Sequence, residues 1–198
     1  MDNSINLVSS LIRSRKSTFT NNLRDNAKIA DSVIEEILEN AVWAPSHGLV
    51  QPWYFKVFSD KGVKSFFLAQ QRIYKESISV EKFNETKYNK FTEKVSKVSH
   101  IVVIICQRDP KQRFPKQEDI VSTACAVQNI YLCLGSYGIA GYLSTGDICY
   151  TRQMREYLQL GDDDECIGFF IMGIADDANV SVTRKRIPAI EKTKWIRE

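Results

Sequence analysis

Residues 44–53 read Ala-Pro-Ser-His-Gly-Leu-Val-Gln-Pro-Trp, the least ordinary segment of this 198-residue chain. Its two prolines restrict the backbone, and its glycine permits close approach of a ligand or another backbone. Ser46, His47 and Gln51 would project polar groups from a rigid loop, as a site for the edge of a planar polar ring requires. The alternative is an ordinary helix-to-strand connection with incidental polar residues.

The segments on both sides of this loop show helical and strand patterns in turn. A helix is expected to begin at Ser32, which has the spacing of a capping box with Glu35, and to end at Ala44-Pro45. Further helices are expected at 5–14, within 60–99, at 117–137 and at 151–160, and strands at 53–58, 100–107, 142–144 and 166–174. This order predicts an α+β class, with helices packed on a mixed sheet. The helix at 117–137 is apolar almost all round, which is typical of a buried helix or a subunit interface.

Composition places the chain among ordinary globular proteins of one domain, residues 1–198. Its 27 basic and 24 acidic residues are well mixed, which argues against a nucleic-acid partner. No apolar run approaches the roughly 20 residues that span a bilayer, and the N-terminal residues lack the apolar core of a signal peptide, so no membrane partner and a cytoplasmic location are expected. Five scattered cysteines and only two histidines predict reduced thiols and no metal site.

Three other polar segments are candidate binding sites. Arg15-Lys16-Ser17 follows the first helix and has the donors to grip a phosphate, or it is only a basic helix end. Residues 141–146 form a strand end that opens into a turn, where backbone N–H groups can donate to a ring nitrogen or an oxyanion. The cluster Arg184-Lys185-Arg186 is a further phosphate contact or a solvated tail. No P-loop, nucleophile elbow or GxGxxG occurs, so the residues alone predict a ligand with a phosphate and a ring.

Taken together and in this order, the segments resemble the nitroreductase family of FMN enzymes, especially its shorter single-domain members. The family has Arg-Arg-Ser after its first helix, matched here by residues 15–17, and an Ala-Pro-Ser-x-x-x-x-Gln-Pro-Trp loop, matched by residues 44–53. Its long central helix contains Ala-x-Gln-Asn, matched by residues 126–129, and a basic residue stands two before a proline, as Arg186 does before Pro188. The resemblance covers nearly the whole chain.

The resemblance implies a nitroreductase-like fold with a mainly antiparallel central sheet, assembled as an intertwined homodimer with FMN sites at the subunit interface. It implies NADH or NADPH as the electron donor and a nitroaromatic, quinone or related small molecule as the acceptor, reduced by ping-pong hydride transfer through flavin N5. The chemistry would be centred on the flavin, so no catalytic side chain is assigned. The cofactor-binding residues would be Arg15, Lys16, Ser17, Pro45, Ser46, His47, Gln51, Leu143, Ser144, Thr145, Gly146, Arg184 and Arg186.

The resemblance also implies how these residues share the cofactor. Residues 15–17 would hold the FMN phosphate, the ribityl chain and the ring edge, and the cluster at 184–186 would neutralise the phosphate. His47 and Gln51 would approach the flavin from the other subunit, and residues 143–146 would lie against the ring. The chain departs from the family pattern at Lys16, where a second arginine is usual, and at Leu49, where many members have asparagine.

Within the single domain, residues at about 70–98 are expected to form a variable helical lid, which would select the acceptor, and residues 176–198 a C-terminal arm. Three other functions stay open at this point. One is an FMN-dependent dehydrogenase or oxidase of a small cyclic or peptide-derived substrate, and another is a flavin-binding protein without turnover. The third is a nucleic-acid or partner-binding module that uses the basic cluster at 184–186.

Overall fold

Four strands form the central sheet of the computed structural model, which describes residues 3–176 and 185–198. Their spatial order is β1-β2-β4-β3, and all three pairings are antiparallel. The strands are β1 (Trp53–Ser59), β2 (His100–Cys106), β3 (Ile139–Ser144) and β4 (Glu165–Ile174). The helices are α1 (Asn3–Ser14), α2 (Asp31–Ala41), α3 (Lys61–Ser77), α4 (Glu85–Glu93), α5 (Lys116–Ser136) and α6 (Arg152–Tyr157). The predicted α+β class is confirmed, and no parallel pair occurs among the described strands.

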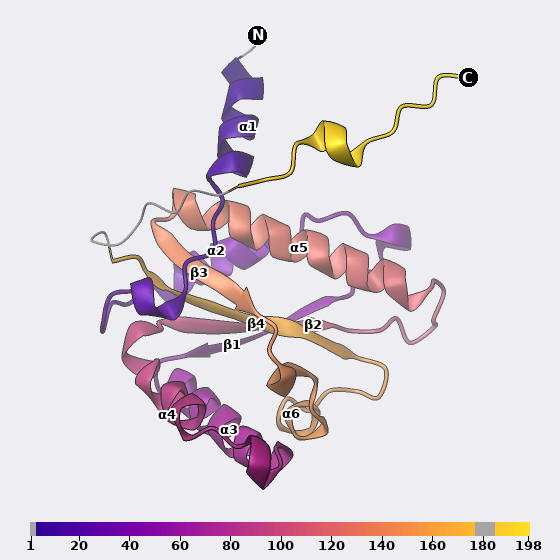
Figure 1. Cartoon of the computed structure of the whole chain (residues 1–198). Helices are drawn as coiled ribbons and strands as arrows, with labels where there is room; N and C mark the ends of the chain where they lie inside the picture. Colours follow the sequence, from indigo (N-terminus) through magenta and orange to yellow (C-terminus); the bar gives the residue numbers. More distant parts are fainter. Residues whose placement is uncertain (1–2, 177–184) are drawn as a thin grey trace.

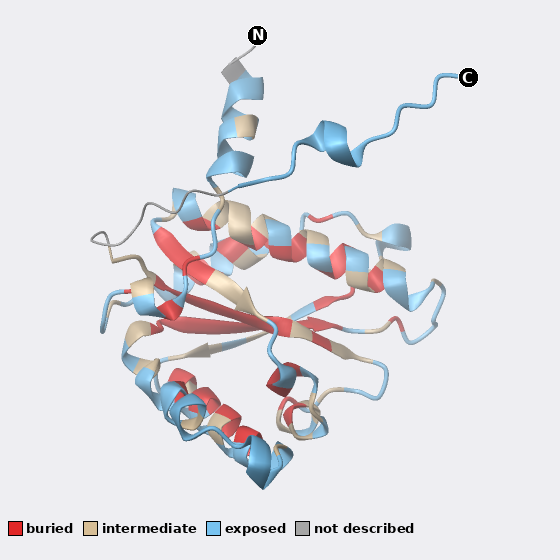
Figure 2. Ribbon diagram, in the orientation of Figure 1, coloured by how far each residue is buried: buried red, intermediate tan, exposed pale blue. Residues whose placement is uncertain are grey.

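Strand β2 lies inside the sheet and is buried along its whole length. Its alternate side chains enter two different cores, because successive residues of a strand point to opposite faces. Ile101, Val103 and Ile105 pack with α3 and α6, whereas Val102 and Ile104 pack with α2 and α5. Helices therefore cover both faces, with the sheet as the buried middle layer (Figure 1, Figure 2).

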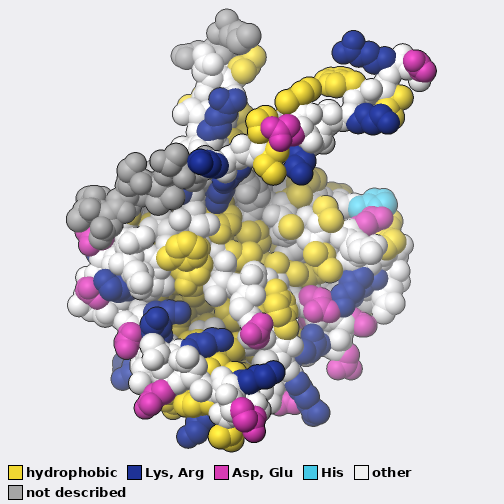
Figure 3. Space-filling model, viewed as in Figure 1, with side chains coloured by type: hydrophobic (Ala, Val, Ile, Leu, Met, Phe, Trp, Pro, Cys, Tyr) yellow, Lys and Arg dark blue, Asp and Glu magenta, His cyan; other side chains and the backbone are white. Residues whose placement is uncertain are grey.

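Helix α1 and the C-terminal residues 185–198 both project from this layered body (Figure 1). Most apolar side chains of α1 are more than half exposed, with Leu7 at 72% and Val8 at 55%. The C-terminal segment likewise exposes Ile190, Trp195 and Ile196. Apolar side chains gather on both projections and on the face of the body beneath them (Figure 3). Exposed apolar side chains gathered in this way are typical of an interaction site.

Several helix and strand boundaries differ from those expected. The predicted capping box at Ser32 is wrong, because α2 begins at Asp31 and its N-cap is Ala30, whose side chain makes no capping bond. The same helix ends at Ala41, and turns lead the chain to Pro45. Strand β3 begins at Ile139, earlier than expected, because its register with β4 extends to that residue.

The cysteines of the described chain are all free, and Cys106, Cys149 and Cys166 are buried. The thiols of Cys149 and Cys166 lie 3.1 Å apart. A hydrogen bond to Cys166 and burial raise the pKa of the Cys149 thiol, which keeps it protonated and poorly nucleophilic. Among the described helices, none is long and apolar enough to cross a membrane.

Candidate functional site

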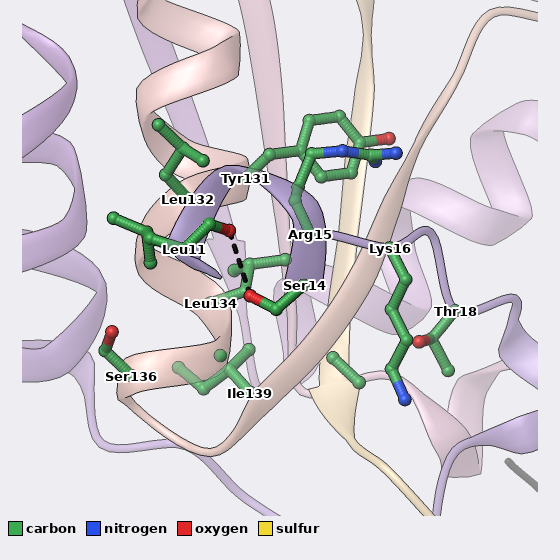
Figure 4. Close-up of a pocket in the computed structure, with 12 residues that line it drawn as sticks. Leu11, Ser14, Arg15, Lys16, Thr18, Tyr131, Leu132, Leu134, Ser136 and Ile139 are labelled. Carbon is green, nitrogen blue, oxygen red and sulfur yellow. Dashed lines mark hydrogen bonds between the residues drawn. The ribbon is translucent and has the colours of Figure 1, made fainter. Parts of the chain in front are cut away.

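Arg15 and Lys16 of the first candidate segment border a cavity of about 490 Å³ between α1, α5 and β3, whereas Ser17 does not line it (Figure 4). Arg15 and Lys16 supply its two cations, and apolar side chains of α1 and α5, such as Leu11 and Leu134, line the rest. The guanidinium of Arg15 lies across the ring of Tyr131, 4.9 Å from its centroid. This cavity combines positive charge with an apolar wall, as a phosphate-bearing ring ligand requires.

Tyr131 connects the first and third candidate segments. Its hydroxyl accepts a hydrogen bond from the backbone N–H of Leu143 at 2.8 Å and lies 3.2 Å from the hydroxyl of Ser17. The backbone N–H of Thr18 also donates to the carbonyl of Gly141 at 2.9 Å, so the 15–18 segment runs beside β3. At Gly141 a side chain would lie 2.4 Å from the carbonyl oxygen of Ile171, so only glycine permits this close approach.

The second candidate segment forms part of a different cavity, of about 500 Å³. Pro45, Ser46 and His47 line it together with Glu118 and other residues of the first half of α5. Within the loop, the hydroxyl of Ser46 accepts the backbone N–H of Gln51 at 2.8 Å, which closes a tight turn. The segment is therefore an organised wall of a cavity and more than a plain connection.

His47 is held on two sides. Its ring stacks on Phe114, with centroids 3.8 Å apart and 27° between the planes. Its Nδ1 forms a short hydrogen bond with the carboxylate of Glu118. Phe114 is held in turn by Arg108, whose guanidinium donates to the Phe114 carbonyl at 2.8 Å and pairs with the buried Asp119. A buried ion pair thus fixes the loop on which the histidine rests.

Gly48 is required for this stacking. Its φ is +56°, and a Cβ atom there would lie 2.5 Å from the Phe114 ring. We expect Gly48→Ala to lower the free energy of unfolding by about 1–2 kcal/mol or to displace the Phe114 ring. Gly138→Ala is the matched control, because Gly138 has φ +66° but nothing within 4 Å of the added atom. Urea unfolding measures the loss of stability in both variants. A larger loss in Gly48→Ala than in Gly138→Ala reports the clash with Phe114, and equal losses would contradict the role of Phe114.

The two cavities lie at opposite ends of α5. Glu118 in the first turn borders one, and Tyr131 in the fifth borders the other. At 1.5 Å per residue, these positions are about 20 Å apart along the helix axis. The structure therefore brings residues 15–17 and 143 together, but within one chain it does not bring His47 to them.

The other predicted site residues have different surroundings. Gln51 is exposed in the left-handed region, with φ +51°, and lines neither cavity. Ser144 ends β3, Thr145 and Gly146 follow it, and none of the three lines either cavity. Arg186 is exposed in the C-terminal segment and donates to the carbonyl of its neighbour Lys185. Arg184 lies outside the described residues.

A match to known sequences decides which protein family the chain belongs to. The sequence model of the Nitroreductase family matches residues 12–174. The chain belongs to the nitroreductase family. Among curated proteins it is similar to "Putative NAD(P)H nitroreductase YfhC" of Bacillus subtilis strain 168, with 24% identity over 160 residues, which are 81% of this chain and 80% of the relative.

Solved structures share the fold of this family member. A nitroreductase-like family protein from Bacillus cereus superimposes with a TM-score of 0.82 at 21% identity, covering 96% of this chain and 95% of that one. The FMN-dependent nitroreductase NfnB from Mycobacterium smegmatis, solved in complex with NADPH, has a TM-score of 0.75 at 16% identity and covers 98% and 100% of the two chains. The resemblance and the nitroreductase-like fold expected from the sequence are confirmed.

Sequence reasoning missed three residues of this family member's site. Tyr131 was expected only as part of the buried pattern of the long helix, although a tyrosine hydroxyl in an apolar helix usually needs a polar partner. Glu118 resembles an ordinary acidic residue in the first helical turn. Phe114 is in a loop and carries no sequence signal of its own, because its role depends on contact with His47, which lies 67 positions earlier.

A Ser-His-Asp chain also occurs in this nitroreductase. His100 contacts the hydroxyl of Ser99 at 3.0 Å and the carboxylate of Asp31 at 2.8 Å. However, Ser99 is fully buried, and its hydroxyl accepts the backbone N–H of Ile29. The arrangement joins α2 to β2 and offers no nucleophile to a substrate.

Proposed function

We propose that this nitroreductase family member is an FMN-dependent oxidoreductase that takes electrons from NADH or NADPH and reduces nitroaromatics, quinones or related flat acceptors. Membership of the family supports this function. The names of its relatives support the donor and the cofactor, since one is called an NAD(P)H nitroreductase and another an FMN-dependent nitroreductase in complex with NADPH. The observation that carries the proposal is the cavity bordered by Arg15, Lys16 and Tyr131.

The residues around this cavity fit FMN. Arg15 and Lys16 would neutralise the phosphate, and the Tyr131 hydroxyl holds the end of β3 beside them. Ser17 would donate to the polar part of the cofactor, and the turn at 144–146 would lie along the ring. When bound, FMN supplies the two-electron chemistry that protein side chains lack. The chain then contributes binding, orientation and positive charge.

A homodimer would complete the site. One chain keeps the His47 cavity and the Arg15 cavity about 20 Å apart on α5. If two copies of α5 pack antiparallel across a two-fold axis, the first half of each helix lies beside the second half of its partner, because the same patch serves both subunits. The His47 cavity of one subunit would then adjoin the Arg15 cavity of the other.

The exposed surface supports this assembly. The outer face of α5 presents Val121, 61% exposed, and the small residue Ala124 to solvent. Helix α1 and the C-terminal arm add the exposed apolar side chains described above. We infer that all three surfaces are covered in an intertwined dimer, in which Arg186 of the arm would reach the phosphate of an FMN.

The test is an absorbance spectrum of purified protein, followed by anaerobic addition of NADH and then NADPH. We expect a flavin spectrum that either donor bleaches and that menadione or a nitroaromatic restores. A flavin spectrum that neither donor bleaches would contradict the proposed direction and favour a dehydrogenase or a binding protein. Protein that binds no FMN after incubation would contradict the proposed function.

Two expectations stay predictions of this proposal. Residues 70–98 hold the end of α3, then α4, and would form the lid that selects the acceptor. Exchange of this segment with that of a relative is expected to change the order of preferred acceptors while FMN content stays constant. A cytoplasmic location is likewise inferred from the expected partners of the enzyme.

A further inference from the structure

The side chain of His47 is exposed to solvent, yet two contacts hold its ring in one orientation. Its side chain is 59% exposed and that of Glu118 is 42% exposed, and an ion pair between such groups contributes at most about 1 kcal/mol of stability. The loop nevertheless uses the left-handed conformation at Gly48 to stack the ring on Phe114. The small gain in stability does not explain why the ring is held in this way. A need for an oriented polar group at the cavity does explain it.

The contacts of His47 determine which ring nitrogen can meet a ligand. Nδ1 is engaged by Glu118, and one face of the ring is covered by Phe114. No described residue forms a hydrogen bond with Nε2 among residues 3–176 and 185–198. A carboxylate on one imidazole nitrogen fixes the orientation of the ring, so Nε2 is the nitrogen left to exchange a proton with a ligand.

The proposed reaction requires a source of protons. Reduction of a quinone by NAD(P)H also consumes one proton: quinone, NAD(P)H and H⁺ give hydroquinone and NAD(P)⁺. NAD(P)H supplies two electrons and one hydrogen, so the second hydrogen of the hydroquinone comes from water or the protein. One-electron acceptors such as ferricyanide take no proton.

Resting on the proposed function, we propose that His47 is a catalytic residue that donates this proton from Nε2 to the acceptor oxygen, and that Glu118 is its positioning residue. The N–H bond of His47 breaks as the O–H bond of the hydroquinone forms. His47 then regains its proton from water at the open side of the cavity.

The cavity has room for this step. It has about 500 Å³ and is lined near His47 by Val121 and Cys125 of α5. A flat apolar acceptor can lie along this wall with one oxygen toward the imidazole. Ser46, Gln117 and Ser122 also line the cavity, but His47 is the lining side chain that a carboxylate and a stacked ring hold in place, so we expect it to set the orientation of the acceptor.

The decisive variants are His47→Gln and Glu118→Gln, each saturated with FMN. We expect kcat with menadione to fall about 100-fold for His47→Gln and about tenfold for Glu118→Gln, with KM nearly unchanged. The ferricyanide rate and the anaerobic bleaching by NADPH should fall far less than the menadione rate. Glu156→Gln is the matched control, because Glu156 forms an exposed ion pair with Arg152 on α6, which lines neither cavity.

A second measurement needs no turnover. The chain has two histidines, so an imidazole ¹H–¹⁵N spectrum of the FMN-loaded protein contains signals of His47 and of the buried His100 only. Menadione added without NAD(P)H should move the ring nitrogens of His47 and leave those of His100 in place.

The outcomes distinguish failure of the proposed His47 role from failure of the proposed function. If menadione leaves the His47 signals unmoved, or if both variants keep the menadione rate, the role of His47 is wrong. If the menadione and ferricyanide rates fall together, the pair acts on cofactor or donor binding and the proton-donor role is also wrong. If no nicotinamide reduces the wild-type protein, the proposed function fails, and the role of His47 fails with it.

Discussion

Arg15→Ala is expected to yield protein that purifies largely without flavin. The guanidinium borders the cavity and lies across Tyr131, so its removal deletes a charge-assisted contact with the phosphate and one wall of the cavity. A hydrogen bond to a charged group contributes about 1.5–3 kcal/mol, which corresponds to roughly a 10- to 150-fold weaker FMN affinity. Fluorescence titration of the flavin-free protein with FMN measures this change.

The matched control is Arg152→Ala, which removes an exposed arginine of α6 that borders neither cavity. It should bind FMN as the wild type does. Tyr131→Phe tests the same cavity through its hydroxyl, whose loss leaves the backbone N–H of Leu143 without its partner. Unchanged FMN affinity in Arg15→Ala would place the phosphate elsewhere.

Ala124→Glu is expected to give a folded monomer with little FMN. Ala124 is exposed on the outer face of α5, so the change costs the isolated chain little, but in the proposed dimer it would place a charge in an apolar contact. Size-exclusion chromatography with light scattering reports the mass, and the absorbance spectrum reports the flavin. The loss of the dimer and the loss of FMN should occur together, because the His47 cavity and the Arg15 cavity would meet at one subunit interface.

Two further variants make this result specific. Ala126→Glu alters a residue that is 0% exposed in the core between α5 and the sheet, so it should unfold the protein rather than separate subunits. Ser65→Glu adds the same charge to an exposed position of α3 and should leave mass and flavin unchanged. A stable yellow monomer from Ala124→Glu would contradict the shared site.

Much of the fold follows from local patterns in the sequence. The run of apolar residues in β2 and the period of α5 are long and strong, and both elements occur within one or two residues of the predicted positions. Boundaries were predicted less well. Ser32 and Glu35 have the spacing of a cap, yet the chain enters α2 before them, because packing of Ile34 and Ile37 in the core outweighs the capping preference.

The candidate site was predicted in pieces. Residues 15–17, 45–47 and 143 were identified as polar groups beside turns, and the structure places each group at or beside a cavity. Their partners were not found, since Tyr131, Glu118 and Phe114 look like ordinary helix or loop residues. A side chain that acts by contact with a distant segment carries no local signal.

The sequence by itself determined the family, the α+β class and the segments with phosphate and ring donors, because these depend on residue type and short-range spacing. Only the tertiary structure decided which segments meet. The sheet and α5 bring Ser17 to Leu143 through Tyr131, and they hold His47 at the other end of the same helix. A helix is rigid over this length, so it separates the two half-sites within one chain, a separation that spacing along the sequence does not reveal.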